Sequence, residues 1–140
     1  MLREAGLSEM RKRGIQKDQC VFVARNRGND EIAPTESLLQ GFMQRKKNLE
    51  RKFGKGSAEA HNQAFLDCDY ENRFRNQIME NPEALKKLAA ISQRAQESDV
   101  FLVCYEGPAK ACHRRTLLRI AEETFGTQVL IEGGRTQKRS

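Results

Sequence analysis

The chain has 140 residues, of which 38% are hydrophobic and 31% are charged. This length fits one domain, since domains usually contain about 100–150 residues. No segment approaches the ~18 consecutive apolar residues of a membrane helix, and the first residues lack the apolar stretch of a secretory signal. We therefore expect a single-domain protein of the cytoplasm with no membrane partner.

Basic residues outnumber acidic residues by 25 to 19, which gives a formal net charge of +6. An excess of positive charge favours a phosphate-bearing partner, either a small ligand or a nucleic acid. Surface lysines that only improve solubility produce the same balance, so the signal is weak. The basic residues cluster at 11–13, 45–47, 51–55, 114–115 and 135–139.

Residues 1–19 are polar and basic and predict a loose or short helical arm. The first strong pattern is the run Cys20–Ala24, which is continuously apolar and rich in β-branched and aromatic side chains. Such a run indicates a strand covered on both faces, as in a parallel sheet. The run Val100–Cys104 has the same character and predicts a second buried strand, and Val129–Ile131 predicts a third.

Helical segments are expected between residues 35 and 97, because apolar side chains recur there every three or four positions. Residue types that favour helix N-caps precede three of these segments. The caps are Thr35, Ser57 and Asn81, and Pro82 follows the last at the first helical position. A further helix begins near Cys112 and ends at Gly126, a residue type common just after a helix.

The alternation of strands and helices predicts an α/β fold, a Rossmann-like three-layer sandwich with a small, mainly parallel sheet and helices on both faces. We assign this single domain to residues 20–132, after the basic N-terminal arm at 1–19 and before a flexible basic tail at 133–140. Because three strands make a small sheet, we expect either a further short strand or a homodimer.

The segment after Cys104 is the best candidate for a functional site. Open α/β sheets bind ligands at the carboxyl ends of their strands. The helix that begins near Cys112 directs its free N–H groups and its positive dipole end toward the same loop. Arg114 and Arg115 add positive charge, so we predict that they bind an anion there.

Cys112 and His113 are the candidate catalytic residues. A thiol at a helix N-terminus loses its proton more easily, and histidine, with a pKa near ~6.5, can act as an acid or a base. Cys104 and Glu106 are candidate ligand-binding residues. Cys104 also suits apolar packing, and Glu106 also suits a simple ion pair.

The four cysteines stand far apart in the sequence, and thiols stay reduced in the cytoplasm. Cys104, Cys112 and His113 are residue types that bind zinc. The gap between the two cysteines, however, exceeds the ~2–4 residues of compact zinc knuckles. We therefore predict no metal site and name no cofactor, and we keep a thiol redox or metal site as an alternative.

A strand that ends in Cys-x-Glu at Cys104 and Glu106 is followed by Cys-His-Arg at 112–114. This pairing resembles the signature of the family catalogued as domain of unknown function 488. The resemblance extends over residues 20–132. It implies a Rossmann-like α/β domain, and it implies no established activity.

The sequence thus predicts an α/β protein that binds or acts on a phosphate-bearing ligand, related to a nucleotide or nucleic acid. The predicted site runs from Cys104 to Arg115. One alternative is a non-enzymatic module that binds nucleic acid through its basic surface. The sequence leaves open whether the protein is an enzyme.

Overall fold

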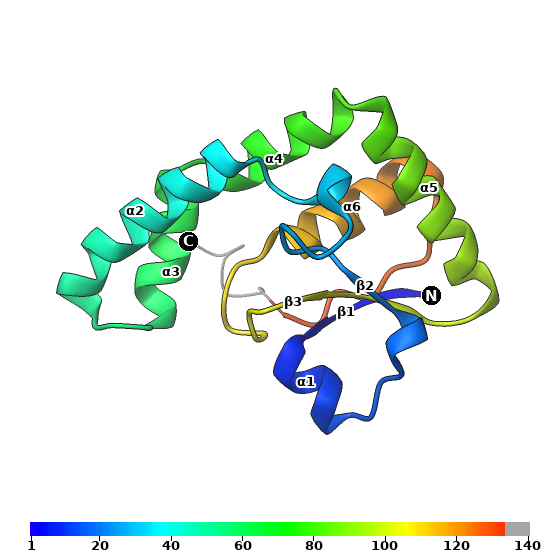
Figure 1. The fold of residues 1–140 in the computed structure, drawn as a ribbon, viewed down its shortest axis with the longest axis horizontal. Coiled ribbons are helices and arrows are strands. Elements are labelled where there is room, and N and C mark those ends of the chain that lie inside the picture. The colour runs from blue at the N-terminus through cyan, green and yellow to red at the C-terminus, as the bar shows by residue number, and fades with distance from the viewer. Residues whose placement is uncertain (134–140) are drawn as a thin grey trace.

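A computed structural model of the chain describes residues 1–133. Apart from Gly133, the tail predicted at 133–140 lies outside the described residues. In that described part, no helix is both long enough and apolar enough to cross a membrane. The elements, in chain order, are β1 (Leu2–Gly6), α1 (Leu7–Lys12), β2 (Cys20–Phe22), α2 (Glu36–Phe53), α3 (Ala58–Asp67), α4 (Tyr70–Met79), α5 (Pro82–Glu97), β3 (Val100–Cys104) and α6 (His113–Phe125) (Figure 1).

The sheet has three parallel strands in the order β1-β3-β2. The central strand, β3, is buried at every position, as its continuous apolar sequence predicts. Leu2 of β1 and Cys20 of β2 pair with Val100 and Phe101 of β3, respectively. All three strands therefore end on the same side of the sheet.

The N-terminal residues belong to the sheet. Leu2–Gly6 form the edge strand β1, and Leu7–Lys12 form α1. The sequence predicted a loose or short helical arm over residues 1–19; α1 is such a short helix, whereas β1 was not predicted. The charged pair Arg3 and Glu4 interrupts the apolar pattern that identifies a strand, and β1 exists because it pairs along its whole length with β3.

The strand predicted at Val129–Ile131 does not form. In the described chain this segment joins the sheet only through a bridge between Leu2 and Val129. The main-chain hydrogen bonds there involve Leu2 alone on the β1 side, with Gln128 and Leu130 as its partners. Leu2 is the first residue of β1, so the segment passes only the start of that strand.

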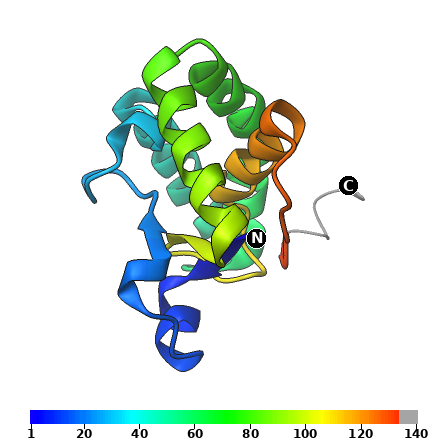
Figure 2. The ribbon, with the colours of Figure 1, turned by 90° about the vertical axis from the view of Figure 1, so that its right-hand side faces the viewer.

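The predicted sandwich is confirmed, with two unequal helical layers. Helices α5 and α6 contact β3 on one face, where the large apolar core lies. On the other face α1 contacts β1 and β3 and covers a small cluster of Ala5, Phe101 and Val103. Figure 2 shows α1 below the sheet and the longer helices above it.

The predicted helix ends are also confirmed. Thr35, Ser57 and Asn81 each accept a hydrogen bond from the first turn of α2, α3 and α5. Gly126 ends α6 in the left-handed region, with φ of 66°. The hairpin of α2 and α3 extends past the ends of the strands (Figure 1), which places it opposite the start of α6.

Candidate functional site

A cavity of about 1150 Å³ lies between the α2–α3 hairpin and the carboxyl ends of β2 and β3. Cys104, Glu106, Cys112 and His113 line it, so the structure brings these four predicted residues together. Its walls are largely apolar and aromatic, and cations lie among the lining residues. The wall residues include Leu39, Phe42, Met43, Phe65 and Tyr70, and the cations are Arg25, Lys46 and Lys47.

The local geometry of Cys112 follows from its position at the N-cap of α6. Its backbone is extended, with φ of −152° and ψ of 144°, and its side chain makes no capping hydrogen bond within the described chain. The loop before it is fixed from α3, where Asn62 Oδ1 accepts from the Ala111 N–H at 2.7 Å and His61 Nε2 donates to the Ala111 carbonyl at 2.7 Å. The sulfur is therefore free for other contacts.

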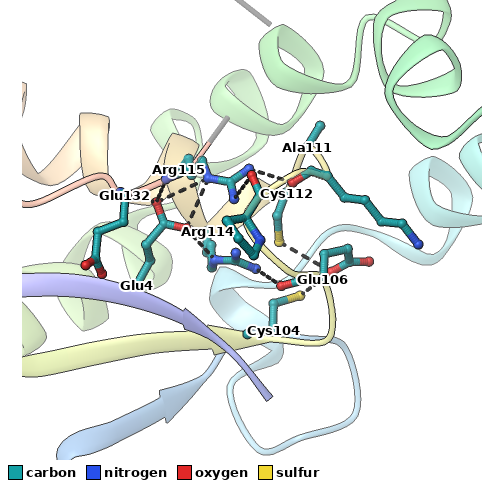
Figure 3. Close-up of polar contacts among 12 residues, drawn as sticks. Glu4, Cys104, Glu106, Ala111, Cys112, Arg114, Arg115 and Glu132 are labelled. Atoms are coloured by element: carbon teal, nitrogen blue, oxygen red, sulfur yellow. Dashed lines mark hydrogen bonds and ion pairs between the residues drawn. The ribbon is translucent and has the colours of Figure 1, made fainter. Parts of the chain in front are cut away.

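Glu106 joins the two cysteines. Its Oε2 accepts from the Cys104 thiol at 3.1 Å and lies 3.6 Å from the Cys112 sulfur (Figure 3). The Cys112 sulfur also lies 3.7 Å from His113 Nδ1. His113 Nε2 donates to the Val23 carbonyl at 2.7 Å, because a carbonyl can only accept. This bond fixes the ring with Nδ1 toward the sulfur.

These contacts determine which groups carry charge. Burial alone would raise the pKa of Cys112, but the Cys104 thiol and the charges of His113 and Arg114 outweigh it and hold that pKa well below its usual value. The hydrogen bond to Cys112, together with burial, raises the pKa of Cys104. Burial lowers the pKa of His113, yet the charge of Cys112 outweighs it, so the net direction is upward. Both directions favour Cys112 over Cys104 as the cysteine that loses its proton first.

Glu106 differs from an ordinary surface carboxylate. Burial, followed by the charge of Cys112, raises its pKa. A carboxyl with a raised pKa keeps its proton to higher pH and can serve as a general acid. This carboxyl lies 3.6 Å from the Cys112 sulfur.

Arg114 and Arg115 are buried beneath the loop, and neither is among the described residues that line the cavity. Both contact Glu4 of β1: the distances from Arg114 Nε and Arg115 Nε to Glu4 Oε1 are 2.8 Å and 3.0 Å. Arg114 also donates to the Glu106 carbonyl at 2.9 Å, and Arg115 to the Lys110 carbonyl at 2.6 Å (Figure 3). These contacts hold the loop, and the anion-binding role of the two arginines stays a prediction.

Three features of the site were not predicted from sequence. Glu4 lies in the segment expected to be a loose arm, and Lys46 and Lys47 lie on a helix far from the signature. His61 is buried, packs edge to face on Phe42 at 4.9 Å, and has its pKa lowered mainly by burial. The only sequence signal for His61 was its place on the apolar face of a predicted helix.

The family model DUF488-N3a, described as "Active DUF488-N3 subclade", matches residues 3–124. The match spans most of the chain, so the chain belongs to this family. No curated protein and no solved structure matches it. The signature residues of the first resemblance, Cys104, Glu106 and the Cys-His-Arg segment, all fall inside the matched range.

Proposed function

We propose that this DUF488 protein is a cytoplasmic enzyme that uses Cys112 as a nucleophile on a phosphate-bearing substrate. One observation carries the proposal: the Cys112 sulfur lies at the N-terminus of α6, on the wall of a large cavity, beside His113 and Glu106. Thiolates rather than thiols are nucleophiles. The free N–H groups of the helix and the neighbouring imidazole both favour the thiolate.

Glu106 completes the chemistry as a proton donor. In the proposed step, the Cys112 sulfur forms a bond to the electrophilic atom of the substrate while the bond from that atom to the leaving group breaks. The leaving group takes the proton of Glu106. Water then attacks the same atom, the bond to sulfur breaks, and the proton of the water returns to Glu106.

The cavity suggests the kind of substrate. Its aromatic and aliphatic walls favour an apolar or planar organic group, whereas Arg25, Lys46 and Lys47 favour an anion. An organic phosphate such as a nucleotide has both parts. The anion is thus assigned to the cations of α2 and the β2–α2 loop, with the reacting atom nearer to Cys112.

Alkylation by iodoacetamide, followed for each cysteine by peptide mass, tests this proposal. We expect Cys112 to react faster at neutral pH than Cys20 and Cys68, although Cys112 is buried and the other two are only half-buried. Adenosine monophosphate or inorganic phosphate at millimolar concentration should slow Cys112 alone. The proposal is overturned if Cys112 reacts no faster than Cys68, or if neither phosphate compound slows it.

A second function is favoured by the α2–α3 hairpin. The turn between α2 and α3 lies at the end of the molecule away from the sheet (Figure 1). The exposed cations Lys47, Arg51, Lys52 and Lys55, in the last turns of α2 and the turn after it, suit the phosphate backbone of a nucleic acid. Binding of a fluorescent DNA duplex should then weaken steeply with salt and weaken further in Lys52→Glu. Lys12→Glu on α1 is the matched control, and equal effects of the two variants would reject this surface.

A further inference from the structure

Four side chains with metal-binding atoms meet on one side of the cavity. The sulfurs of Cys104 and Cys112 and a ring nitrogen of His113 all lie within 4.8 Å of one another. Glu106 Oε2 lies 3.1 Å from the first sulfur and 3.6 Å from the second. Thiolate, imidazole and carboxylate are the donors that zinc takes in proteins. We propose that these four residues form a Zn²⁺ site.

The distances between the donors fit a tetrahedral ion. Zinc bonds are ~2.3 Å long to sulfur, ~2.0–2.1 Å to nitrogen and ~2.0–2.2 Å to oxygen. Around a tetrahedral ion, a sulfur ligand therefore lies about 3.6 Å from a nitrogen or oxygen ligand. The Cys112 sulfur lies 3.7 Å from His113 Nδ1 and 3.6 Å from Glu106 Oε2. The Cys104 sulfur lies 3.1 Å from Glu106 Oε2, so this contact, now a hydrogen bond, must lengthen by about 0.5 Å. The donor atoms of Cys104, Cys112 and His113, which lie within 4.8 Å of one another, must move to about 3.6–3.8 Å apart.

The histidine is already oriented as a ligand. Its Nε2 donates to the Val23 carbonyl, so Nδ1 is the nitrogen left for a metal. Phe74 packs edge to face on the same ring at 5.2 Å. Such second contacts usually fix the ring of a zinc-bound histidine.

The spacing that argued against zinc in the sequence has a structural answer. A zinc knuckle takes its two cysteines from one tight turn. Here Cys104 ends a strand, Cys112 begins a helix, and the loop between them folds back so that the two ends meet. The extended backbone of Cys112 also lets it and the adjacent His113 contact each other.

Nearby positive charge balances the site. Two thiolates and one carboxylate around Zn²⁺ carry a net charge of −1. The guanidinium of Arg114, bonded to the Glu106 carbonyl at 2.9 Å, lies beside this group. Zinc binding at these residues does not depend on the proposed reaction. If the proposed reaction takes place, zinc should also inhibit it, because the metal occupies the Cys112 sulfur.

Co²⁺ is the probe for the site, since it takes the same tetrahedral ligands as Zn²⁺ and its absorption spectrum depends on those ligands. The full chain, reduced with a phosphine and stripped of metal, should bind one Co²⁺ with a thiolate-to-cobalt charge-transfer band that Zn²⁺ abolishes. Cys104→Ser should weaken that band and lower the affinity at least ~10-fold. Cys68→Ser, which changes a cysteine outside the site, should leave both unchanged.

Alkylation of the wild-type chain gives a second measurement that needs no variant. Zn²⁺ should protect Cys104 and Cys112 from iodoacetamide and leave Cys20 and Cys68 unaffected. The zinc site is overturned if Co²⁺ binds without a thiolate-to-cobalt band. It is also overturned if Zn²⁺ does not selectively protect Cys104 and Cys112 from iodoacetamide. If Cys112 of the metal-free chain still reacts fastest in that case, the proposed nucleophile survives. If the chain binds one Zn²⁺ and Cys112 of the metal-free chain reacts slowly with iodoacetamide, the proposed nucleophile is rejected and the metal site is supported.

Discussion

Removing the charge of Glu4 should destabilise the protein more than any surface change. The Glu4 side chain is 3% exposed, and its two oxygens accept from Arg114 Nε and Arg115 Nε. They also accept from the main-chain N–H groups of Glu132 and Gly133. Removing one partner of a buried ion pair costs about 3–5 kcal/mol, because the other charge stays buried without compensation. In Glu4→Gln the amide oxygen can still accept a hydrogen bond, but two buried guanidinium groups lose the negative charge that compensates them, so we expect a loss near the top of that range.

Urea unfolding followed by circular dichroism measures this effect. Glu4→Gln should lower the midpoint with little change in slope, which indicates a change in stability rather than in compactness. Glu97→Gln removes a carboxylate from the exposed end of α5 and should shift stability by no more than about 0.5 kcal/mol. A loss below 1 kcal/mol for Glu4→Gln would show that β1 and the loop do not depend on this ion pair.

Three further outcomes follow from single contacts. Cys104 helps to lower the pKa of Cys112, so in Cys104→Ala the pH midpoint of Cys112 alkylation should rise, by about 1 pH unit for each ~1.4 kcal/mol lost, whereas Cys68→Ala should not move it. Burial lowers the pKa of His61 below its usual value of 6.5. Below that pH the unfolded chain binds more protons than the folded chain, so stability should fall as the pH drops through 6.5. His61→Gln, whose amide can still donate to the Ala111 carbonyl, should flatten this fall in urea unfolding at pH 5 to 8. Thr35→Ala removes the N-cap of α2 and should cost about 1 kcal/mol by the same method, unless water replaces the hydroxyl.

Much of the fold was predictable because its signals are local. The apolar run of β3, the N-caps of the helices and Gly126 depend on neighbouring residues, and each was confirmed. Strand β1 was missed because its evidence is not local. Glu4 is a polar residue inside a strand, and the arginines that neutralise it lie 110 and 111 positions later. No periodicity in the sequence shows such a pair.

The candidate site was half predictable for the same reason. One strand end and the following helix start bring together Cys104, Glu106 and Cys112, and their order along the chain predicts that meeting. The cavity needs the α2–α3 hairpin as its opposite wall, and nothing in the sequence fixes the direction of that hairpin. Lys46 and Lys47 were therefore predicted only as part of a basic cluster at 45–47, although they line the cavity.

The contacts of Arg114 explain why an arginine follows the Cys-His pair. Its Nε contacts Glu4 and its Nη1 donates to the Glu106 carbonyl, so one planar group connects β1, α6 and the loop. We therefore infer that Arg114 is a positioning residue for Glu106. Arg114→Lys keeps the charge but cannot make both contacts with one ammonium group.

We expect Arg114→Lys to leave the Glu106 carbonyl unpaired, which costs about 1–3 kcal/mol in urea unfolding. It should also move the pH midpoint of Cys112 alkylation, because the carboxyl beside the sulfur shifts with its backbone. Arg119→Lys, whose partner Glu71 is exposed, is the control and should change neither measurement. A variant that loses stability but keeps the alkylation profile of the wild type would make Arg114 a structural residue only, with no influence on the thiolate.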